Sequence, residues 1–302
     1  MEKKLINSEA AIQNRFCDLH MHSVYSDGSY TPTELIDEAE RIGLYAIALC
    51  DHNGVGGLPE FLESAKGRSV TAVAGAEFST DYKDKELHIL ALGIRPECFG
   101  EISALMEDVC RRKEQSNVEL VEALARAGYV VDYEKIKAQK SGKYINRAHI
   151  AAELMANGYV SSIKEAFVRL VAKDGGFYKE PKRPSAFEMI EFIKKIGAVA
   201  VLAHPFLNLD ERELREFLPQ AKRHGLDGME TLYSEYDAET VALSKEIAEE
   251  YGLLESGGSD FHGSNRPHIS MGTGRGALQV PAALADRIID RIKENEKRSQ
   301  DR

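Results

Sequence analysis

Two histidines separated by one residue, His20 and His22, follow an early apolar segment of the sequence. Residues two apart in a β-strand point to the same face, so both imidazoles could bind one metal ion. Asp27 follows in a loop before Gly28 and adds a carboxylate. A His-x-His pair alone is weak evidence for a metal site, and it gains weight only from further ligands elsewhere.

Further possible ligands stand at the ends of later apolar segments. If these segments are parallel strands, their C-terminal ends meet at one rim, where active sites lie in α/β folds. The candidates at such ends are His20, His22, His52, Glu77, His204, Asp260 and His262. His88 lies near the start of its segment, which indicates a strand that runs antiparallel or bends. Nitrogen and oxygen donors without thiolates suit Zn²⁺, Mn²⁺ or Fe²⁺, and Glu77 could bridge two ions.

The segments that must position these residues alternate between strand and helix. We expect strands at 15–20, 45–50, 70–76, 87–92, 198–203, 228–233 and 253–257. We expect helices at 32–42, 58–66, 185–196, 211–224, 237–251 and 281–297. Thr31, Pro32 and Glu34 provide start signals for the first helix, and Gly43 ends it. This alternation indicates a parallel α/β architecture.

The alternation stops between roughly 96 and 182, where the pattern predicts helices at 102–128, 147–157 and 163–172. We therefore expect a discontinuous α/β domain at 16–95 and 183–298. A helical insertion or cap domain would occupy 96–182, and an N-terminal tail 1–15.

Composition narrows the possible partners and the compartment. The 302 residues carry a formal net charge of −10, so no general basic surface favours duplex nucleic acid. The four cysteines lack CxxC spacing. The first 15 residues are polar and charged, and no apolar run approaches the ~20 residues of a membrane span. We expect a cytoplasmic protein that does not bind membranes.

Six short motifs together resemble the ordered motifs of the PHP (polymerase and histidinol phosphatase) family. They are Asp18–Ser23, Ser26–Gly28, Cys50–Asn53, Gly75–Glu77, His204–Pro205 and Gly258–His262. The resemblance implies a distorted (β/α)7 barrel with a trinuclear metal centre. It implies a first ion at His20, His22, Glu77 and Asp260, a second at Glu77, His88 and His204, and a third at Asp27, His52 and His262. The cofactors would be two to three divalent ions of Mn²⁺, Zn²⁺ or Fe²⁺.

The predicted insertion resembles that of one particular group within the PHP family. Asn146–Ala151, and Gly176–Tyr178 before Pro181, resemble the inserted domain of bacterial PHP phosphoesterases that act on 3′,5′-nucleoside bisphosphates or on short RNA from the 5′ end. We therefore expect a nucleotide or short-oligonucleotide substrate, with the insertion closing over the barrel rim. Arg147, His149 and Arg266 could bind phosphate, although Arg266 could instead form a structural salt bridge.

The expected chemistry is phosphate ester hydrolysis. Bound metal ions neutralise phosphate charge and lower the pKa of a bound water towards ~7, so that a metal-bound hydroxide can attack phosphorus. Metal-bound imidazoles usually donate their other N–H group to an acceptor, so Asp18 and Asp51 could orient them or lie just behind them. The sequence assigns no general acid.

Three alternatives remain. A histidinol-phosphate phosphatase is the closest, although a small amino-alcohol phosphate needs no helical cap. A polymerase-associated proofreading domain is another, although 302 residues are too few for a polymerase. A metal-binding scaffold with weak catalysis is the third, although the ligand set has no missing member. The metal, the exact substrate and the oligomeric state are open.

Overall fold

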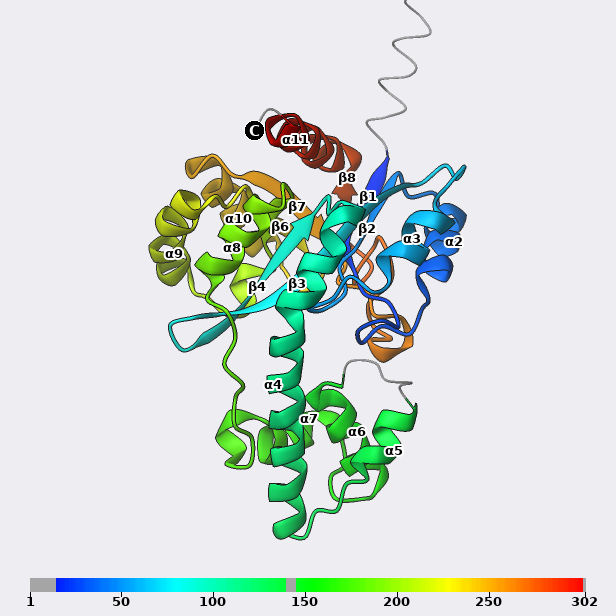
Figure 1. Ribbon diagram of the computed structural model, residues 1–302, viewed down its shortest axis with the longest axis vertical. Coiled ribbons are helices and arrows are strands. Elements are labelled where there is room, and N and C mark those ends of the chain that lie inside the picture. Colours follow the sequence, from blue (N-terminus) through cyan, green and yellow to red (C-terminus); the bar gives the residue numbers. More distant parts are fainter. Residues whose placement is uncertain (1–14, 140–144, 301–302) are drawn as a thin grey trace, which may run out of the picture. The chain divides into compact units, whose positions relative to one another are not determined.

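The computed structural model of the protein describes residues 15–139 and 145–300. Most of the expected N-terminal tail, residues 1–14, lies outside the described residues. The chain forms two compact units (Figure 1). The first comprises the described residues up to Ser103 together with those from Pro184 onward, and the second comprises Ala104–Arg183.

The first unit is built around one eight-stranded sheet with the order β7-β6-β5-β4-β3-β2-β1-β8. The strands are β1 (Phe16–Met21), β2 (Ala46–Leu49), β3 (Thr71–Tyr82), β4 (Lys85–Leu92), β5 (Val199–Leu202), β6 (Gly228–Tyr233), β7 (Leu254–Gly258) and β8 (Val280–Pro281). β1, β2 and β3 pair in parallel, as do β5, β6 and β7. β4 is antiparallel to both of its neighbours, and β8 is antiparallel to β1.

The sheet curls until its two ends meet between β1 and the residues after β7. The Asp260 N–H group donates to the His20 carbonyl at 2.9 Å, and the His22 N–H group donates to the Phe261 carbonyl at 2.9 Å. The result is the distorted α/β barrel that the sequence predicted. The antiparallel direction of β4 also confirms the expectation for the strand that carries His88.

One strand differs from its expected length in a way that affects the site. Glu77 was expected at the end of a strand over 70–76, but β3 continues to Tyr82 and Glu77 lies near its middle. The reason is a hairpin, because β3 pairs with β4 without a break from Gly75 to Tyr82. Glu77 is still level with the end of β2, since it bridges to His52.

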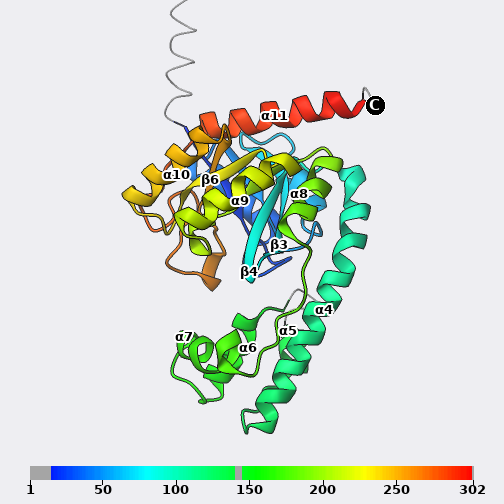
Figure 2. The same cartoon turned by 90° about the vertical axis from the view of Figure 1, so that its left-hand side faces the viewer.

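Six α-helices surround the barrel in the described part of the first unit. They are α2 (Pro32–Ile42), α3 (Leu58–Ser64), α8 (Ala186–Lys195), α9 (Glu211–His224), α10 (Ala238–Glu250) and α11 (Ala282–Gln300). Thr31 and Glu34 form the expected capping box of α2, and Gly43 ends this helix with a φ of 79°. Helix α11 packs against β1, β5 and β7. It lies across one end of the barrel (Figure 2). Leu19, Ala48, Leu90 and Val201 lie in the buried core.

The second unit is helical. Its elements are α4 (Phe99–Arg126), which begins in the first unit, α5 (Tyr133–Gln139), α6 (Arg147–Ala156), α7 (Ile163–Ala166), a π-helix (Phe167–Val171) and a 3₁₀ turn (Lys173–Gly175). It has its own core around Leu120, Leu124, Ile150, Leu154 and Leu170. The expected helix over 163–172 is thus divided into α7 and the π-helix, and α5 was not predicted. None of the described helices combines the length and the apolar character that a bilayer span requires.

Candidate metal centre

All nine predicted ligands come together in the first unit. They form four overlapping groups of side chains whose donor atoms lie within 4.8 Å of one another. The groups are His22, Asp27, His52 and His262; His20, Glu77 and His204; His20, His22 and Asp260; and His52, Glu77 and His88. The cluster therefore holds six imidazoles and three carboxylates.

The first two imidazoles lie at the end of β1. His20 and His22 are fully buried, and their Nε2 atoms lie 3.2 Å apart, as the i, i+2 spacing predicted. The loop that follows turns back sharply at Gly28, where a Cβ atom would lie 2.2 Å from the His22 carbonyl oxygen. Only glycine fits so close an approach, and this turn brings Asp27 to the cluster.

Four donor atoms enclose a first position. Glu77 Oε2 lies 3.3 Å from the Nε2 atoms of both His20 and His22. Asp260 Oδ1 lies 3.1 Å from His22 Nε2 and 3.8 Å from His20 Nε2. A tetrahedral ion with bonds of about 2.1 Å holds its donors about 3.4 Å apart. These four atoms therefore match a four-coordinate site.

The other two expected ligand groups adjoin this position. Glu77 Oε1 lies 2.7 Å from His88 Nδ1 and 2.9 Å from His204 Nε2. Asp27 Oδ1 lies 3.1 Å from His262 Nε2 and 3.8 Å from His52 Nε2. Glu77 Oε2 also lies 3.0 Å from His52 Nδ1. Since the two Glu77 oxygens face different histidines, this carboxylate has the geometry of a bridge.

Two buried atoms support metal binding directly. Within the part of the chain that the structure describes, Glu77 Oε2 and His262 Nε2 are buried and make no hydrogen bond of acceptable geometry. A buried polar atom without a partner is costly, and a cation would satisfy both atoms. The residues therefore fit a metal cluster.

The charged and buried side chains of the cluster shift one another's pKa values. Burial alone would lower the pKa of His22, but Asp260 and Glu77 raise it to about 9. Burial would also lower the pKa of His88, but Glu77 raises it to about 10. Burial would raise the pKa of Glu77, but His88 and His20 hold it well below its usual range. The carboxylates thus attract positive charge, which protons provide in the absence of metal.

Strained backbone accompanies the ligands. His204 has a φ of 26° and Asp260 a φ of 57°, values that non-glycine residues rarely adopt. Asn53, beside His52, has a φ of 49°. Such strain persists only where surrounding contacts enforce it, and it commonly occurs at functional sites.

Asp18 and Asp51 take positions other than the one expected beside an imidazole. Asp51 accepts hydrogen bonds from the Ser23 N–H and hydroxyl groups at 2.8 and 2.6 Å and from the Ser26 hydroxyl at 2.6 Å. Asp18 accepts from the Ser259 N–H and hydroxyl groups at 2.8 and 2.5 Å. Of the two expected placements, these contacts correspond to the second, in which the carboxylates lie just behind the ligands. Both carboxylates hold loops that carry ligands, because their oxygens accept hydrogen bonds from the backbone and hydroxyl groups of these loops.

Sequence reasoning missed two residues of β6. Glu230 Oε1 lies 3.0 Å from His20 Nδ1, and its Oε2 accepts from the His204 N–H group at 2.8 Å. The Tyr233 hydroxyl donates to Asp260 Oδ2 at 2.9 Å. A glutamate inside a predicted strand of a parallel sheet was the available signal, since such strands are buried and a buried carboxylate needs donors around it.

The phosphate-binding candidates divide between the two units. Arg266 Nη1 donates to Asp260 Oδ2 at 2.5 Å, and the side chain remains 41% exposed. Arg147 begins α6 in the second unit, where its guanidinium lies 4.2 Å from the centre of the Tyr178 ring and donates to the Val171 carbonyl. His149 Nδ1 accepts from the Asn146 N–H group at the start of α6. Arg266 thus lies beside the metal cluster of the first unit.

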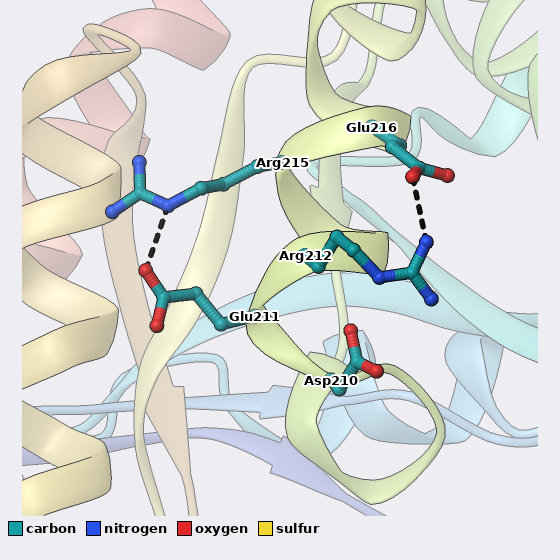
Figure 3. A pocket seen from close by; sticks show the side chains of 5 residues that line it. All are labelled: Asp210, Glu211, Arg212, Arg215 and Glu216. Atoms are coloured by element: carbon teal, nitrogen blue, oxygen red, sulfur yellow. Dashed lines mark hydrogen bonds and ion pairs between the residues drawn. The ribbon is translucent and has the colours of Figure 1, made fainter.

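A separate surface hollow lies at the start of α9 (Figure 3). Asp210, Glu211, Arg212, Arg215 and Glu216 line it. Arg215 pairs with Glu211 at 2.8 Å and Arg212 with Glu216 at 2.9 Å. Because these charges satisfy one another along the helix, we assign the hollow no function.

Known proteins resemble this chain over most of its length. Residues 18–196 match the PHP domain family. A 5′-3′ exoribonuclease of Haemophilus influenzae is 32% identical over 81% of this chain and 89% of its own. A phosphoribosyl 1,2-cyclic phosphate 1,2-diphosphodiesterase of Eggerthella lenta is 30% identical over 83% and 97%. A 3′,5′-nucleoside bisphosphate phosphatase of Chromobacterium violaceum is 28% identical over 81% and 86%.

A solved structure agrees with these relatives. A Bifidobacterium adolescentis protein described as a metal-dependent phosphoesterase superposes with a TM-score of 0.80 at 28% identity, over 92% of this chain and 96% of that one. The barrel and its histidine–carboxylate cluster define a metal-dependent phosphoesterase, a hydrolase of phosphate ester bonds. The chain belongs to the PHP domain family.

Proposed function

We propose that the protein hydrolyses phosphate esters of nucleotides, either 3′,5′-nucleoside bisphosphates or short 5′-phosphorylated oligoribonucleotides. The observation that carries this proposal is the coverage of the relatives. An exoribonuclease and a nucleoside bisphosphate phosphatase each align over 81% of this chain, which is more than the first unit alone provides. Their similarity therefore extends beyond the metal motifs into the helical unit.

We further propose that the nine clustered side chains hold two or three divalent ions such as Mn²⁺, Zn²⁺ or Fe²⁺. His20, His22, Glu77 and Asp260 would hold one ion; Glu77, His88 and His204 a second; and Asp27, His52 and His262 a third. When bound, such ions neutralise phosphate charge and lower the pKa of a coordinated water. Glu77 would join two ions, because its two oxygens face different ligand groups.

Arg266 is the proposed phosphate ligand beside this cluster. Its ion pair with Asp260 fixes the guanidinium next to a metal ligand, and 41% of the side chain is exposed. An arginine in this position can donate from its remaining N–H groups to a substrate phosphate oxygen. Asp18 and Asp51 contribute indirectly, since they hold the loops that carry Asp260 and Asp27.

Arg147 and His149 are the proposed ligands for a second phosphate or for the nucleotide body. The Tyr178 ring stacks against the Arg147 guanidinium, which keeps this side chain ordered with its positive charge intact. The Asn146 side chain already accepts from the Ala148 and His149 N–H groups. The role therefore depends on the guanidinium and the imidazole rather than on free backbone groups.

A substrate comparison tests the proposal. Protein loaded with Mn²⁺ is incubated with adenosine 3′,5′-bisphosphate, a short 5′-phosphorylated RNA, a ribosyl 1,2-cyclic phosphate and histidinol phosphate, and the products are separated. We expect the highest kcat/KM for the bisphosphate or the RNA. Faster hydrolysis of histidinol phosphate would favour the amino-alcohol phosphatase alternative. Bound ions without turnover of any of these substrates would favour a scaffold with weak catalysis.

A further inference from the structure

Glu230 is a fully buried carboxylate in the middle of β6, between Met229 and Thr231, which are also buried. A charged group at such a position is costly unless hydrogen bonds compensate it. Glu230 does not belong to any of the four candidate ligand groups. Its burial therefore needs a different explanation.

The two oxygens of Glu230 contact two different candidate ligands. Oε1 lies 3.0 Å from the His20 Nδ1 atom. Oε2 accepts a hydrogen bond from the His204 backbone N–H group at 2.8 Å. His20 belongs to the proposed first ion and His204 to the proposed second, so one carboxylate contacts both parts of the cluster.

The contact with His20 determines which ring nitrogen is available to a metal ion. A carboxylate can only accept, so His20 must carry a proton on Nδ1 to bond Glu230. In the neutral ring that binds a metal ion, the lone pair is then on Nε2, the atom that lies 3.3 Å from Glu77 Oε2 and 3.2 Å from His22 Nε2. This is the tautomer that a metal ligand requires.

The contact with His204 acts on the backbone. His204 has a φ of 26° and a ψ of 56°, a strained conformation for a residue with a side chain. The bond from its N–H group to Glu230 helps to hold this conformation. In it, His204 Nε2 lies 2.9 Å from Glu77 Oε1.

We propose that Glu230 is a positioning residue that fixes one histidine of each of two neighbouring ion sites and so couples the occupancy of these sites. The proposal rests on the ligand set proposed above. It does not depend on which nucleotide is the substrate.

Replacement of Glu230 by glutamine separates this role from simple packing, because the side chains have nearly the same shape. If the amide oxygen accepts from His204, the amide NH₂ group faces His20 Nδ1. His20 must then move its proton to Nε2, the atom that faces the metal position. If the amide is turned round, its NH₂ group meets the His204 N–H group, and two donors face each other.

The matched control is Glu255→Gln on the adjacent strand β7. The Glu255 carboxylate accepts from the Thr231 hydroxyl at 2.9 Å and makes no contact with a candidate ligand that the structure records. A glutamine can accept the same hydroxyl hydrogen bond. This variant therefore changes a neighbouring carboxylate without changing the proposed positioning.

Metal binding is measured by dialysis of native protein and both variants against buffered Mn²⁺ or Zn²⁺, followed by elemental analysis. Circular dichroism and thermal unfolding of the metal-free forms check the fold. We expect Glu230→Gln to weaken binding by about 10- to 100-fold and to empty two positions together. Glu255→Gln should bind as native protein does. Equal affinity and stoichiometry in native protein and Glu230→Gln would overturn the proposal.

A second measurement needs no change at Glu230, so it applies even if that variant does not fold. In zinc-loaded native protein, nitrogen-15 NMR of the histidine rings should show His20 with its proton on Nδ1 and in slow exchange. The signal is assigned by its loss in His20→Gln. A His20 proton on Nε2, or one that exchanges rapidly on Nδ1, would contradict the proposal. Native protein that binds no ion at all would overturn the ligand set itself.

Discussion

The Nε2 atoms of His20 and His22 face each other at 3.2 Å inside the barrel. Two protonated nitrogens cannot approach so closely without repulsion, so at least one of them must present a lone pair. Carboxylate oxygens of Glu77 and Asp260 lie within 3.8 Å of both nitrogens. A cation among these donors would best satisfy the arrangement.

Elemental analysis after loading should find more than one ion per chain. Neighbouring ions joined by a bridging carboxylate should lie roughly 3.5–4 Å apart. Because both oxygens of Glu77 face ligand groups, Glu77→Gln should lose two ions together. Glu213→Gln, whose carboxylate pairs with Lys85 on the barrel exterior, should keep the native stoichiometry. A single ion per chain under saturating Mn²⁺ and Zn²⁺ would contradict this prediction.

Metal loading at pH 8 should release protons. The pKa of His22 is raised to about 9 and that of His88 to about 10, so the metal-free protein holds protons on both rings at pH 8. A metal ion binds the neutral imidazole and displaces these protons. Apparent affinity should therefore increase as the pH rises from 7 towards 9. Calorimetry in buffers with different ionisation enthalpies measures the released protons, and an identical heat in all buffers would rule the release out.

Arg147→Ala should impair hydrolysis of the nucleoside bisphosphate selectively. Loss of a charged hydrogen bond costs about 1.5–3 kcal/mol, which lowers kcat/KM roughly 10- to 100-fold. Turnover of a small generic phosphate ester should change little, because such an ester does not need the second contact. Arg169→Ala provides a control in the same unit, since Arg169 pairs with Glu165 on the surface. Equal losses on both substrates would indicate that Arg147 supports the fold or the metal centre.

Gly28→Ala should disturb the loop that presents Asp27. An added Cβ would lie 2.2 Å from the His22 carbonyl oxygen, so the backbone must move. Such overpacking costs about 1–3 kcal/mol of unfolding free energy, and it should weaken the ion held by Asp27, His52 and His262. Gly100→Ala in α4 is the matched control, because a Cβ there meets no atom within 4 Å. Chemical unfolding and metal titration of both variants test the prediction, which fails if the two behave alike.

Local signals in the sequence determined much of the fold. The bounds of α2 and α9 were predicted correctly because each helix has a capping side chain before it and a glycine after it, and α2 also begins with a proline. Short motifs beside apolar segments also predicted the nine ligand candidates, and the structure brings these side chains together, while their role as ligands stays a prediction. Helix α5 was missed although Asp132 caps its start, because it is only seven residues long, and the π-helix was predicted as part of one continuous helix.

Contacts between distant residues decided the rest. Glu77 lies inside a long strand because β3 continues into a hairpin with β4, and no pattern within β3 reveals its partner. Glu230 contacts the His20 ring although the two residues are 210 positions apart in the sequence. Ser259 donates a hydrogen bond to Asp18, which is 241 positions away. Spacing along a chain predicts which side chains share a face of one strand. Only closure of the barrel determines which donor reaches each buried carboxylate, because burial forces these groups to pair with whatever the neighbouring strands present.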